Sequence, residues 1–220
     1  MSEKNLKKQI YRELSQICGA MANQYRLEIL EVLSQGAFSV EQIAGKTGLT
    51  IANTSQHLQK LKNARLVKTR RSGKQVFYEL SGQQVYQAWK SQLELGLSLS
   101  AELQSLMQEY RNKKDHLESI DVQTLKEKIR NNEVLVIDVR PKDDFESEHI
   151  PGALSIPLDS LDSYLDQLPD DKQIVAYCRG ELCAMADEAT EFLTTKGFSA
   201  IRFEEGVPGW KSMGYPIETS

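Results

Sequence analysis

The stretch IVAYCRGELCAM, residues 174–185, decides how we expect the second half of the chain to fold. Residues 174–177 form a short apolar run with the length and β-branched content of a buried strand. Residues 184–196 carry apolar side chains at helical spacing. A tight loop with two cysteines, Cys178 and Cys183, joins the two segments. The pattern predicts a strand, a thiol-bearing loop and a helix in direct succession.

Cys178 lies where this strand ends and faces the helix N-terminus. Backbone N–H groups at a helix N-terminus have no partner within the helix, and the helix dipole presents its positive end there. Both favour a thiolate, and Arg179 adds a cation, so we expect Cys178 to be a stronger nucleophile than an ordinary cysteine. Gly180 lets the backbone curl around the sulfur. The alternative is a buried structural cysteine, because cysteine is among the residue types most often buried.

Three blocks within residues 122–217 resemble the rhodanese family of sulfurtransferases. They are VLVIDVRPKDDFESEHIPGALSIPL (134–158), CRGELC (178–183) and EEGVPGWKSMGYPI (204–217). The resemblance implies that Cys178 carries a persulfide, and it matches Asp138 and Arg140 to the family's DVR block and His149 to the histidine before its I-P-G-A turn. Asp138 and Arg140 close a second strand, so we expect them to shape the same site. A structural ion pair is an equally supported alternative for these two.

The end of the cysteine loop departs from the family pattern. Active thiosulfate sulfurtransferases carry a second basic residue late in this loop, whereas this chain has Leu182 and Cys183 there. The departure argues against efficient thiosulfate turnover. Cys183 favours another chemistry, in which it attacks a persulfide or sulfenate on Cys178 and closes a disulfide. That step requires the two Cα atoms to approach within about 7 Å.

Composition and charge exclude several classes of protein. The 220 residues contain three cysteines, no apolar stretch long enough to span a membrane and no signal peptide. We therefore expect a cytoplasmic protein with thiol chemistry rather than a disulfide scaffold. Residues 1–116 contain 17 Lys and Arg against 10 Asp and Glu, whereas residues 117–220 contain 10 against 21. This asymmetry predicts two domains and a polyanion as the partner of the first.

The first domain has the spacing of a helix-turn-helix. Helices are expected at residues 4–20 and 23–33, followed by residues 39–45, where Ser39 and Gln42 form a capping-box pattern. After the turn at residues 47–49, Thr50 caps a further helix over residues 51–64. The apolar residues Ile51, Leu58 and Leu61 are expected to face inward.

The polar face of this last helix, together with the next segment, predicts a DNA reader. Two strand-like runs, 66–71 and 75–80, flank Ser72-Gly73-Lys74 and form a hairpin with a basic tip, which makes a winged helix. Short polar side chains early in such a helix reach base edges in the major groove, and a basic wing holds phosphates. The predicted DNA contacts are Thr50, Asn53, Thr54, Ser55, Gln56, His57, Lys60, Arg70, Arg71 and Lys74. A solvated polar face is the alternative.

Residues 5–113 resemble the ArsR family of bacterial repressors, on the segments MANQYRLEILEVL, GLTIANTSQHLQKLKNARLV and RRSGKQVFYEL. The resemblance implies a homodimer that reads a palindromic site in double-stranded DNA. The resemblance also suggests a metal-sensing function. However, the expected third helix contains no cysteine, and the expected last helix has no matching set of Asp and His residues. We therefore expect no metal and no cofactor.

Residues 83–114 are expected to form one long helix that is apolar on two faces, so that one face packs on its own domain and the other on a partner chain. The polar segment 112–119 marks the expected boundary between a winged helix-turn-helix domain, residues 1–116, and a rhodanese-like domain, residues 117–220. Helices and strands alternate in the second domain, which predicts an α/β fold with a mainly parallel sheet. The site is expected at the strand ends.

These features combine into a hypothesis of a transcriptional repressor that senses or handles reactive sulfur. Cys178 takes up sulfur from a small donor such as a persulfide or thiosulfate, Cys183 resolves it or stabilises the loop, and operator affinity changes. The rival hypothesis is a working sulfurtransferase with an independent DNA-binding domain. A third hypothesis makes the rhodanese-like fold an inert interaction module.

Overall fold

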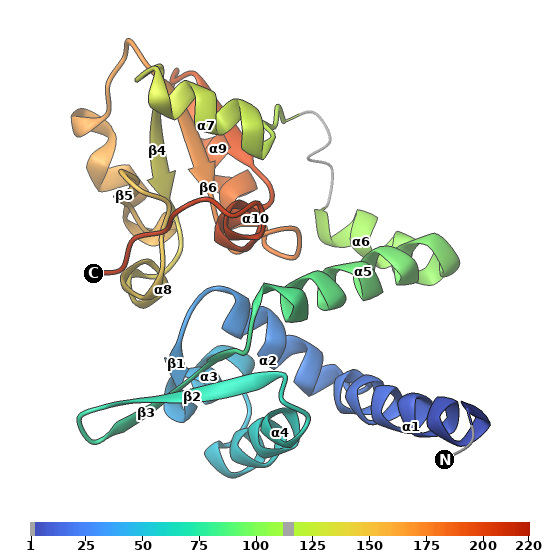
Figure 1. The fold of residues 1–220 in the computed structure, drawn as a ribbon. Coiled ribbons are helices and arrows are strands. Elements are labelled where there is room, and N and C mark those ends of the chain that lie inside the picture. The colour runs from blue at the N-terminus through green and yellow to red at the C-terminus, as the bar shows by residue number, and fades with distance from the viewer. Residues whose placement is uncertain (1–2, 112–116) are drawn as a thin grey trace. The chain divides into compact units, whose positions relative to one another are not determined.

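The computed structural model describes residues 3–111 and 117–220 (Figure 1). The chain divides into two compact units, Met1–Ser91 and Gln92–Ser220, and each is described separately. The predicted domain boundary falls on residues 112–116, which lie outside the described residues, so the division into 1–116 and 117–220 stays a prediction.

The first unit is a winged helix-turn-helix, which confirms the predicted fold class. Its elements are α1 (Glu3–Met21), α2 (Gln24–Ser34), β1 (Phe38–Ser39), α3 (Val40–Thr47), α4 (Ile51–Asn63), β2 (Val67–Ser72), β3 (Gln75–Leu80) and the start of α5 (Gln83–Leu99). Local signals set the helix starts: Asn23, Ser39 and Thr50 each accept a backbone N–H with the side chain. The predicted capping box of Ser39 and Gln42 is present.

The wing is an antiparallel sheet with strand order β1-β3-β2. Gly73, with φ of 59°, turns β2 into β3. The two-residue strand β1, which the sequence does not predict, pairs Phe38 with Tyr78. The core beneath the wing includes Leu58 and Leu61 of α4, both fully buried. Ile51 was expected to face inward, but its side chain is 52% exposed, so this expectation is wrong.

The predicted long helix over residues 83–114 is two helices. α5 ends at Leu99 and α6 (Ala101–Arg111) begins after Ser100, whose hydroxyl accepts the backbone N–H of Leu103 at 3.1 Å. Ser100 therefore caps a new helix instead of continuing the old one. The predicted end at Lys114 lies outside the described residues.

The rest of the second unit is an α/β fold with a four-stranded parallel sheet of order β5-β4-β6-β7, as predicted. Its elements are α7 (Val122–Arg130), β4 (Val134–Asp138), α8 (Lys142–Ser147), β5 (Leu154–Ser155), the 3₁₀ helix η1 (Leu158–Gln167), β6 (Gln173–Tyr177), α9 (Met185–Thr195), β7 (Ala200–Phe203) and α10 (Gly206–Ser212). β7 and α10 were not predicted from the sequence.

Alternating side chains divide this unit into three layers, because successive residues of a strand point to opposite faces of a sheet. Val136 and Tyr177 pack toward α7 and α10, whereas Ile137 and Ala176 pack toward α9 and η1. Figure 1 shows α7 and α9 on opposite faces of the sheet. Cys178 follows β6 and belongs to the α9 side. The fold thus places the cysteine loop at the carboxyl end of a central strand, facing a helix N-terminus.

No helix in the described parts of the chain is both long enough and apolar enough to cross a membrane.

Candidate functional site

The loop between β6 and α9 is held from behind by the start of α10. Gly180 has φ of 118°, and the backbone N–H of Cys183 donates to the carbonyl oxygen of Gly180 at 3.0 Å. Gly206 has φ of 58° and touches the loop so closely that a Cβ there would lie 2.3 Å from the carbonyl oxygen of Cys178. The glycine in the closing block is therefore required by backbone contact with the cysteine loop.

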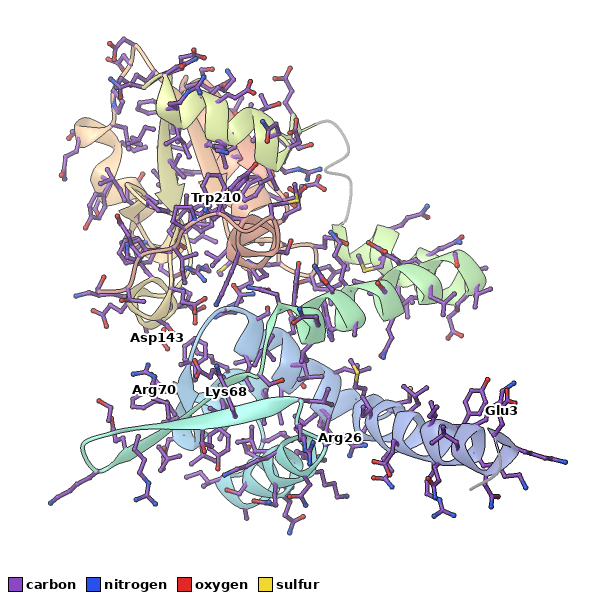
Figure 2. The ribbon with its side chains drawn as sticks, viewed as in Figure 1. Glu3, Arg26, Lys68, Arg70, Asp143 and Trp210 are labelled. Atoms are coloured by element: carbon purple, nitrogen blue, oxygen red, sulfur yellow. The ribbon has the colours of Figure 1, made fainter. Side chains whose placement is uncertain are left out.

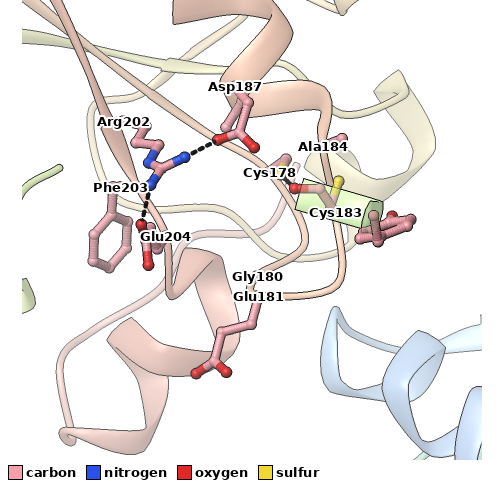
Figure 3. A pocket seen from close by; sticks show the side chains of 11 residues that line it. Cys178, Gly180, Glu181, Cys183, Ala184, Asp187, Arg202, Phe203 and Glu204 are labelled. Atoms are coloured by element: carbon pink, nitrogen blue, oxygen red, sulfur yellow. Dashed lines mark hydrogen bonds and ion pairs between the residues drawn. The ribbon is translucent and has the colours of Figure 1, made fainter. Parts of the chain in front are cut away.

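The loop brings the two thiols together at one cavity, as Figure 3 shows. The Cys178 thiol donates a hydrogen bond to the carbonyl oxygen of Cys183 at 3.3 Å. Cys178 is only 2% exposed, whereas Cys183 is partly exposed. The inner thiol is thus shielded by the protein and the outer one faces solvent.

Backbone amides surround both sulfur atoms. Ala184, the N-cap of α9, offers no side-chain hydrogen bond to the helix. The amides of Gly180 and Ala186 act to lower the pKa of Cys178, and those of Arg179 and Met185 act to lower the pKa of Cys183. The sulfur atoms take the place of a capping side chain at the positive end of the helix dipole.

Their surroundings shift the pKa values of the two thiols in opposite directions. Burial raises the pKa of the Cys178 thiol well above its usual range, and the hydrogen bond with Cys183 raises it further. The hydrogen bond from Cys178, aided by the amides of Arg179 and Met185, lowers the pKa of Cys183 to about 7 despite its partial burial. The expectation that Cys178 is a stronger nucleophile than an ordinary cysteine stays a prediction, and Cys183 joins it as a second thiol whose surroundings favour ionisation.

Arg179 is held in an ion pair, and its predicted action on Cys178 stays a prediction. Its guanidinium pairs with the buried carboxylate of Asp144, with Nε and Nη2 each 2.8 Å from Oδ2. Asp144 is fully buried, and its carboxylate can stay charged there because the guanidinium neutralises the charge. Arg179 anchors the loop to α8, and its backbone N–H reaches the sulfur of Cys183. Sequence reasoning missed Asp144, because only the fold brings these two residues together.

Asp138 and Arg140 form a fully buried ion pair, with Arg140 Nη2 2.6 Å from Asp138 Oδ2. Arg140 also donates to the carbonyl oxygen of Glu148 at 2.7 Å. His149 stacks on Phe145, with ring centroids 3.7 Å apart, and is buried. The structure supports the structural alternative for Asp138 and Arg140, because enclosed side chains cannot contact a sulfur donor.

The cavity wall also contains an arginine that sequence reasoning did not identify. Arg202 of β7 pairs with Asp187 at 2.7 Å and with Glu204 at 2.5 Å (Figure 3). Two carboxylates thus balance its charge, and Glu181 adds a further carboxylate to the wall. A dianion such as thiosulfate gains little from this surface. The only sequence signal for Arg202 is the charged pattern RFEE at residues 202–205.

The described residues contain no cluster of three or more His, Cys, Asp or Glu side chains arranged to hold a metal ion.

The DNA-binding prediction rests on α4 and the wing. Of the predicted contacts, the exposed ones are Thr50, Asn53, Ser55, Gln56, Lys60, Arg70, Arg71 and Lys74. Thr54 is fully buried and its hydroxyl donates to the Thr50 carbonyl oxygen at 3.0 Å, so it cannot contact DNA and is withdrawn. His57 is partly buried beside Tyr25, with ring centroids 5.5 Å apart, and burial lowers its pKa. Gln59, which the prediction omitted, shares the exposed face.

The wing has two unequal faces. Lys68 lies 3.5 Å from Glu79, and Arg70 stacks over Phe77 on the same face (Figure 2). Arg71 points to the opposite face, which it shares with Thr69, because side chains alternate along a strand. Lys62 of α4 donates to the Thr69 hydroxyl at 3.3 Å, so this second face is the one next to α4.

Comparison with known proteins finds matches in both halves of the chain. Residues 23–69 match the bacterial regulatory protein, arsR family, and residues 121–213 match the rhodanese-like domain. The chain is 33% identical over 221 residues to an HTH-type transcriptional regulator of Mycobacterium tuberculosis (Rv0324), covering 94% of this chain and 90% of that protein.

Other matches cover one half each. A sulfurtransferase of Allochromatium vinosum is 28% identical over 100 residues, which is 44% of this chain and 92% of that protein. A fragment from Mycobacterium bovis, solved as a homodimeric winged helix-turn-helix DNA-binding domain, is 33% identical with a TM-score of 0.42; the match covers 46% of this chain and 92% of that one.

Proposed function

The chain belongs to the ArsR family of bacterial transcriptional regulators and carries a rhodanese-like domain, and we propose that it is a repressor whose operator affinity responds to reactive sulfur. The observation that carries the proposal is a pair of cysteines at a helix N-terminus that has no side-chain cap, where the Cys178 thiol donates to the carbonyl oxygen of Cys183. The same chain also has a DNA-reading fold. A small persulfide is the favoured sulfur donor, because the carboxylates beside the cavity disfavour a dianion.

We infer that the regulator acts as a homodimer. The stripe Leu6, Ile10, Leu14 and Ile17 of α1 stays between 41% and 52% exposed in the single chain. An apolar stripe of this length is normally buried against a partner. A second copy is the partner we infer, because the related fragment from Mycobacterium bovis is described as homodimeric. A two-fold dimer suits a palindromic operator.

The dimer is tested with one introduced charge at two positions of α1. Ile10→Glu is expected to shift the full chain toward monomer in sedimentation velocity, because it places a carboxylate in the apolar interface. Ser15→Glu, on the opposite face of the helix, is expected to leave the dimer intact. Equal sedimentation of both variants with the wild type would remove α1 from the interface.

The sensing hypothesis is tested by gel shift on a duplex selected for binding from random sequences. Adding a low-molecular-weight persulfide is expected to change the operator affinity of the wild type by about 5-fold to 150-fold, the usual range of coupling between sites. Cys178→Ser and Cys183→Ser are expected to bind operator normally and to lose the response. An operator affinity that ignores the donor in the wild type would end the sensing hypothesis.

The second candidate function is a working sulfurtransferase beside an independent DNA-binding domain. It is favoured by the match to a sulfurtransferase over 92% of that protein's length. A turnover assay with thiosulfate or persulfide as donor and cyanide as acceptor separates the two functions. Many turnovers per chain, together with a constant operator affinity, would support the enzyme instead of the sensor.

A further inference from the structure

Tyr110 of α6 lies at the cavity of the two cysteines. Its hydroxyl donates to the carbonyl oxygen of Leu182 in the cysteine loop at 2.8 Å, and it lines the same cavity as Cys178 and Cys183. α6 and the loop both belong to the compact unit Gln92–Ser220, so this contact lies within one unit. Tyr110 is 51% exposed, so burial of its ring does not account for its position. The hydrogen bond is therefore a specific contact between α6 and the loop that carries the thiols.

The carbonyl group that Tyr110 binds is next to the one that the Cys178 thiol binds. The Cys178 thiol donates to the carbonyl oxygen of Cys183 at 3.3 Å. The preceding peptide group accepts from Tyr110 through its Leu182 carbonyl oxygen, and its N–H donates to the carbonyl oxygen of Gly180 at 3.0 Å. Each peptide group is planar, so a shift of one is passed to the next. The contact of Tyr110 with the loop therefore depends on the contact that Cys178 makes.

A sulfur atom added to Cys178 acts on this arrangement in two ways. The inner sulfur of Cys178–S–SH carries no proton, so the Cys183 carbonyl oxygen loses its donor. The cavity has a volume of about 20 Å³, room for about one water molecule, and a sulfur atom is larger than a water oxygen. Because protein interiors are close-packed, the loop has to move to admit the added atom.

The packing of α10 decides which part of the loop moves. A Cβ at Gly206 would lie 2.3 Å from the Cys178 carbonyl oxygen and 3.0 Å from the Gly180 backbone nitrogen, so residues 178–180 already touch the backbone of α10. Residues 182–183 are held at their carbonyl oxygens by the side chains of Tyr110 and Cys178. Side-chain hydrogen bonds yield more easily than backbone in close contact, so the displacement falls on residues 182–183.

α6 is joined to the helix that enters the DNA-binding unit. α5 begins in the first compact unit and ends in the second. Where α5 meets α6, the side-chain amide of Gln104 donates to the Leu97 carbonyl oxygen at 2.6 Å. Near the start of α5, the indole N–H of Trp89 donates to the carbonyl oxygen of Leu27 in α2 at 3.1 Å. A hydrogen-bonded path therefore runs along the chain from Tyr110 to the winged helix-turn-helix.

We propose that Tyr110 couples the cysteine loop to the DNA-binding unit. Its hydroxyl holds the Leu182 carbonyl oxygen while Cys178 is a free thiol, and this hydrogen bond breaks when Cys178 carries sulfur, which releases the end of α6. The inference rests on the proposed response to reactive sulfur and names the contact through which the site acts. A hydroxyl that is bonded in one state and released in the other supplies the differential contact that coupling between two sites requires.

The chemistry at Cys178 balances with a small persulfide R–S–SH as the only reactant. The sulfur of Cys178 attacks the terminal sulfur of the donor, the donor S–S bond breaks, and R–S⁻ leaves with the Cys178 proton as R–SH. When Cys183 then attacks the inner sulfur of Cys178–S–SH, a disulfide closes and the outer sulfur leaves with the Cys183 proton as H₂S. Neither product has a proton on the Cys178 sulfur, so both end its hydrogen bond to the Cys183 carbonyl oxygen.

The hydrogen bond is tested with Tyr110→Phe, which removes the hydroxyl and keeps the ring. The matched control is Tyr215→Phe, which removes the hydrogen bond of another tyrosine in the same unit, to Gln123 at 2.7 Å. Both substitutions are made in the full chain.

The first measurement is the equilibrium of sulfur exchange, by whole-protein mass spectrometry at fixed ratios of a small persulfide to its thiol. The background carries Cys18→Ser and Cys183→Ser, so that Cys178 alone takes up sulfur and keeps it. Tyr110→Phe is expected to shift the equilibrium toward the Cys178 persulfide by about 2-fold to 12-fold, the contribution of one hydrogen bond of usual strength, because only the thiol state loses a contact. Tyr215→Phe is expected to match the background protein.

The second measurement is the operator response, by gel shift with the cysteines as in the wild type. The change in operator affinity on persulfide treatment is expected to be at least about twofold smaller in Tyr110→Phe than in the wild type. Tyr215→Phe is expected to keep the full change.

Hydrogen–deuterium exchange of the wild type guards against variants that misfold. After sulfur uptake, the amides of residues 104–111 are expected to exchange faster, because the end of α6 has lost the contact that held it. The amides of α7 serve as the reference and are expected to exchange as before.

The outcomes separate this inference from the proposed function. An unchanged sulfur equilibrium in Tyr110→Phe, or a full operator response in that variant, would overturn the role of Tyr110 and leave sulfur sensing in place. A wild type whose operator affinity ignores the persulfide would overturn both. Unchanged exchange at the end of α6 after complete sulfur uptake would contradict the release independently of any variant.

Discussion

At the scale of single residues, Gly206 controls the shape of the thiol loop. A Cβ at this position would lie 2.3 Å from the carbonyl oxygen of Cys178, and the backbone has φ of 58°. We expect Gly206→Ala to destabilise the full chain by about 1–2 kcal/mol through the left-handed backbone and by about 1–3 kcal/mol more through the clash. Urea unfolding measures the total.

The matched control is Gly152→Ala. Gly152 also has a positive φ, of 75°, but a Cβ there meets open space. Its variant is expected to carry the backbone cost alone, and alkylation of Cys183 is expected to stay as in the wild type. If Gly206→Ala were no less stable than Gly152→Ala, the close contact between α10 and the loop would not be a constraint on the site.

The Cys183 thiolate makes the stability of the fold depend on pH. Its pKa is lowered to about 7 in the folded chain, so the folded state releases the proton more readily than the unfolded state. This contribution is fully present above the ordinary thiol pKa and is lost as the pH falls through about 7. The pKa of Cys178 is raised in the folded chain, so at pH values above the ordinary thiol pKa it lowers the stability of the fold as the pH rises.

The prediction compares the wild type with Cys183→Ser under reducing conditions. The difference in free energy of unfolding is expected to grow by on the order of 2 kcal/mol between pH 6 and pH 8.5, with the wild type gaining. Cys18→Ser, which changes an exposed thiol, is expected to track the wild type at every pH. A difference that stays flat across this range would contradict the lowered pKa.

At the scale of elements, the wing is expected to contact DNA through the face that lies next to α4. Arg71 shares that face with Thr69, which Lys62 of α4 contacts, whereas Lys68 lies on the other face 3.5 Å from Glu79. Arg71→Ala is expected to weaken operator binding and to reduce the slope of log affinity against log salt by about 1, as for the loss of one phosphate contact. Lys68→Ala is the control and is expected to change the slope less. Fluorescence anisotropy over a salt series measures both variants, and equal slopes would mean that the wing faces DNA differently.

Elements with local signals could be predicted from the sequence. Asn23, Ser39 and Thr50 start helices with their own side chains, and Gly73 turns the hairpin. The break at Ser100 could not be predicted, because a serine inside an apolar helical pattern does not by itself end a helix. β7 and α10 could not be predicted either, because a four-residue strand and a short helix containing Gly and Pro show only weak hydrophobic periodicity.

The candidate site divides in the same way. The strand, the loop and the helix N-terminus around Cys178 are local, and the sequence predicts them. The acidity of the thiols depends on burial beneath α9 and on contact between two cysteines five residues apart, where the Cys178 thiol donates to the Cys183 carbonyl oxygen. Arg179 pairs with Asp144, which lies 35 residues earlier in the sequence. Distances of that kind are set by tertiary packing, so a pattern of residues could not rank the two cysteines.

At the scale of the whole molecule, sulfur chemistry and DNA binding have to be linked in both directions if they are linked at all. When the disulfide changes operator affinity by some factor, bound operator must change the equilibrium between dithiol and disulfide by the same factor. The two halves differ in charge, with 17 Lys and Arg against 10 Asp and Glu in residues 1–116 and 10 against 21 in residues 117–220. The excess of basic residues makes the first half the one expected to bind DNA.

We predict that saturating operator shifts the midpoint of disulfide formation in a thiol redox buffer, by the factor that the gel shift gives for the oxidised and reduced proteins. The disulfide is expected to become harder to form on operator if oxidation weakens binding, because DNA then stabilises the dithiol state. Alkylation of the remaining thiols after acid quench measures the midpoint. A scrambled duplex of equal length controls for general electrostatics, and the full chain with Arg71→Ala is expected to show the same shift once its weaker binding is saturated. A large effect of oxidation on DNA affinity without any effect of DNA on the midpoint would mean that a step other than this disulfide changes the affinity.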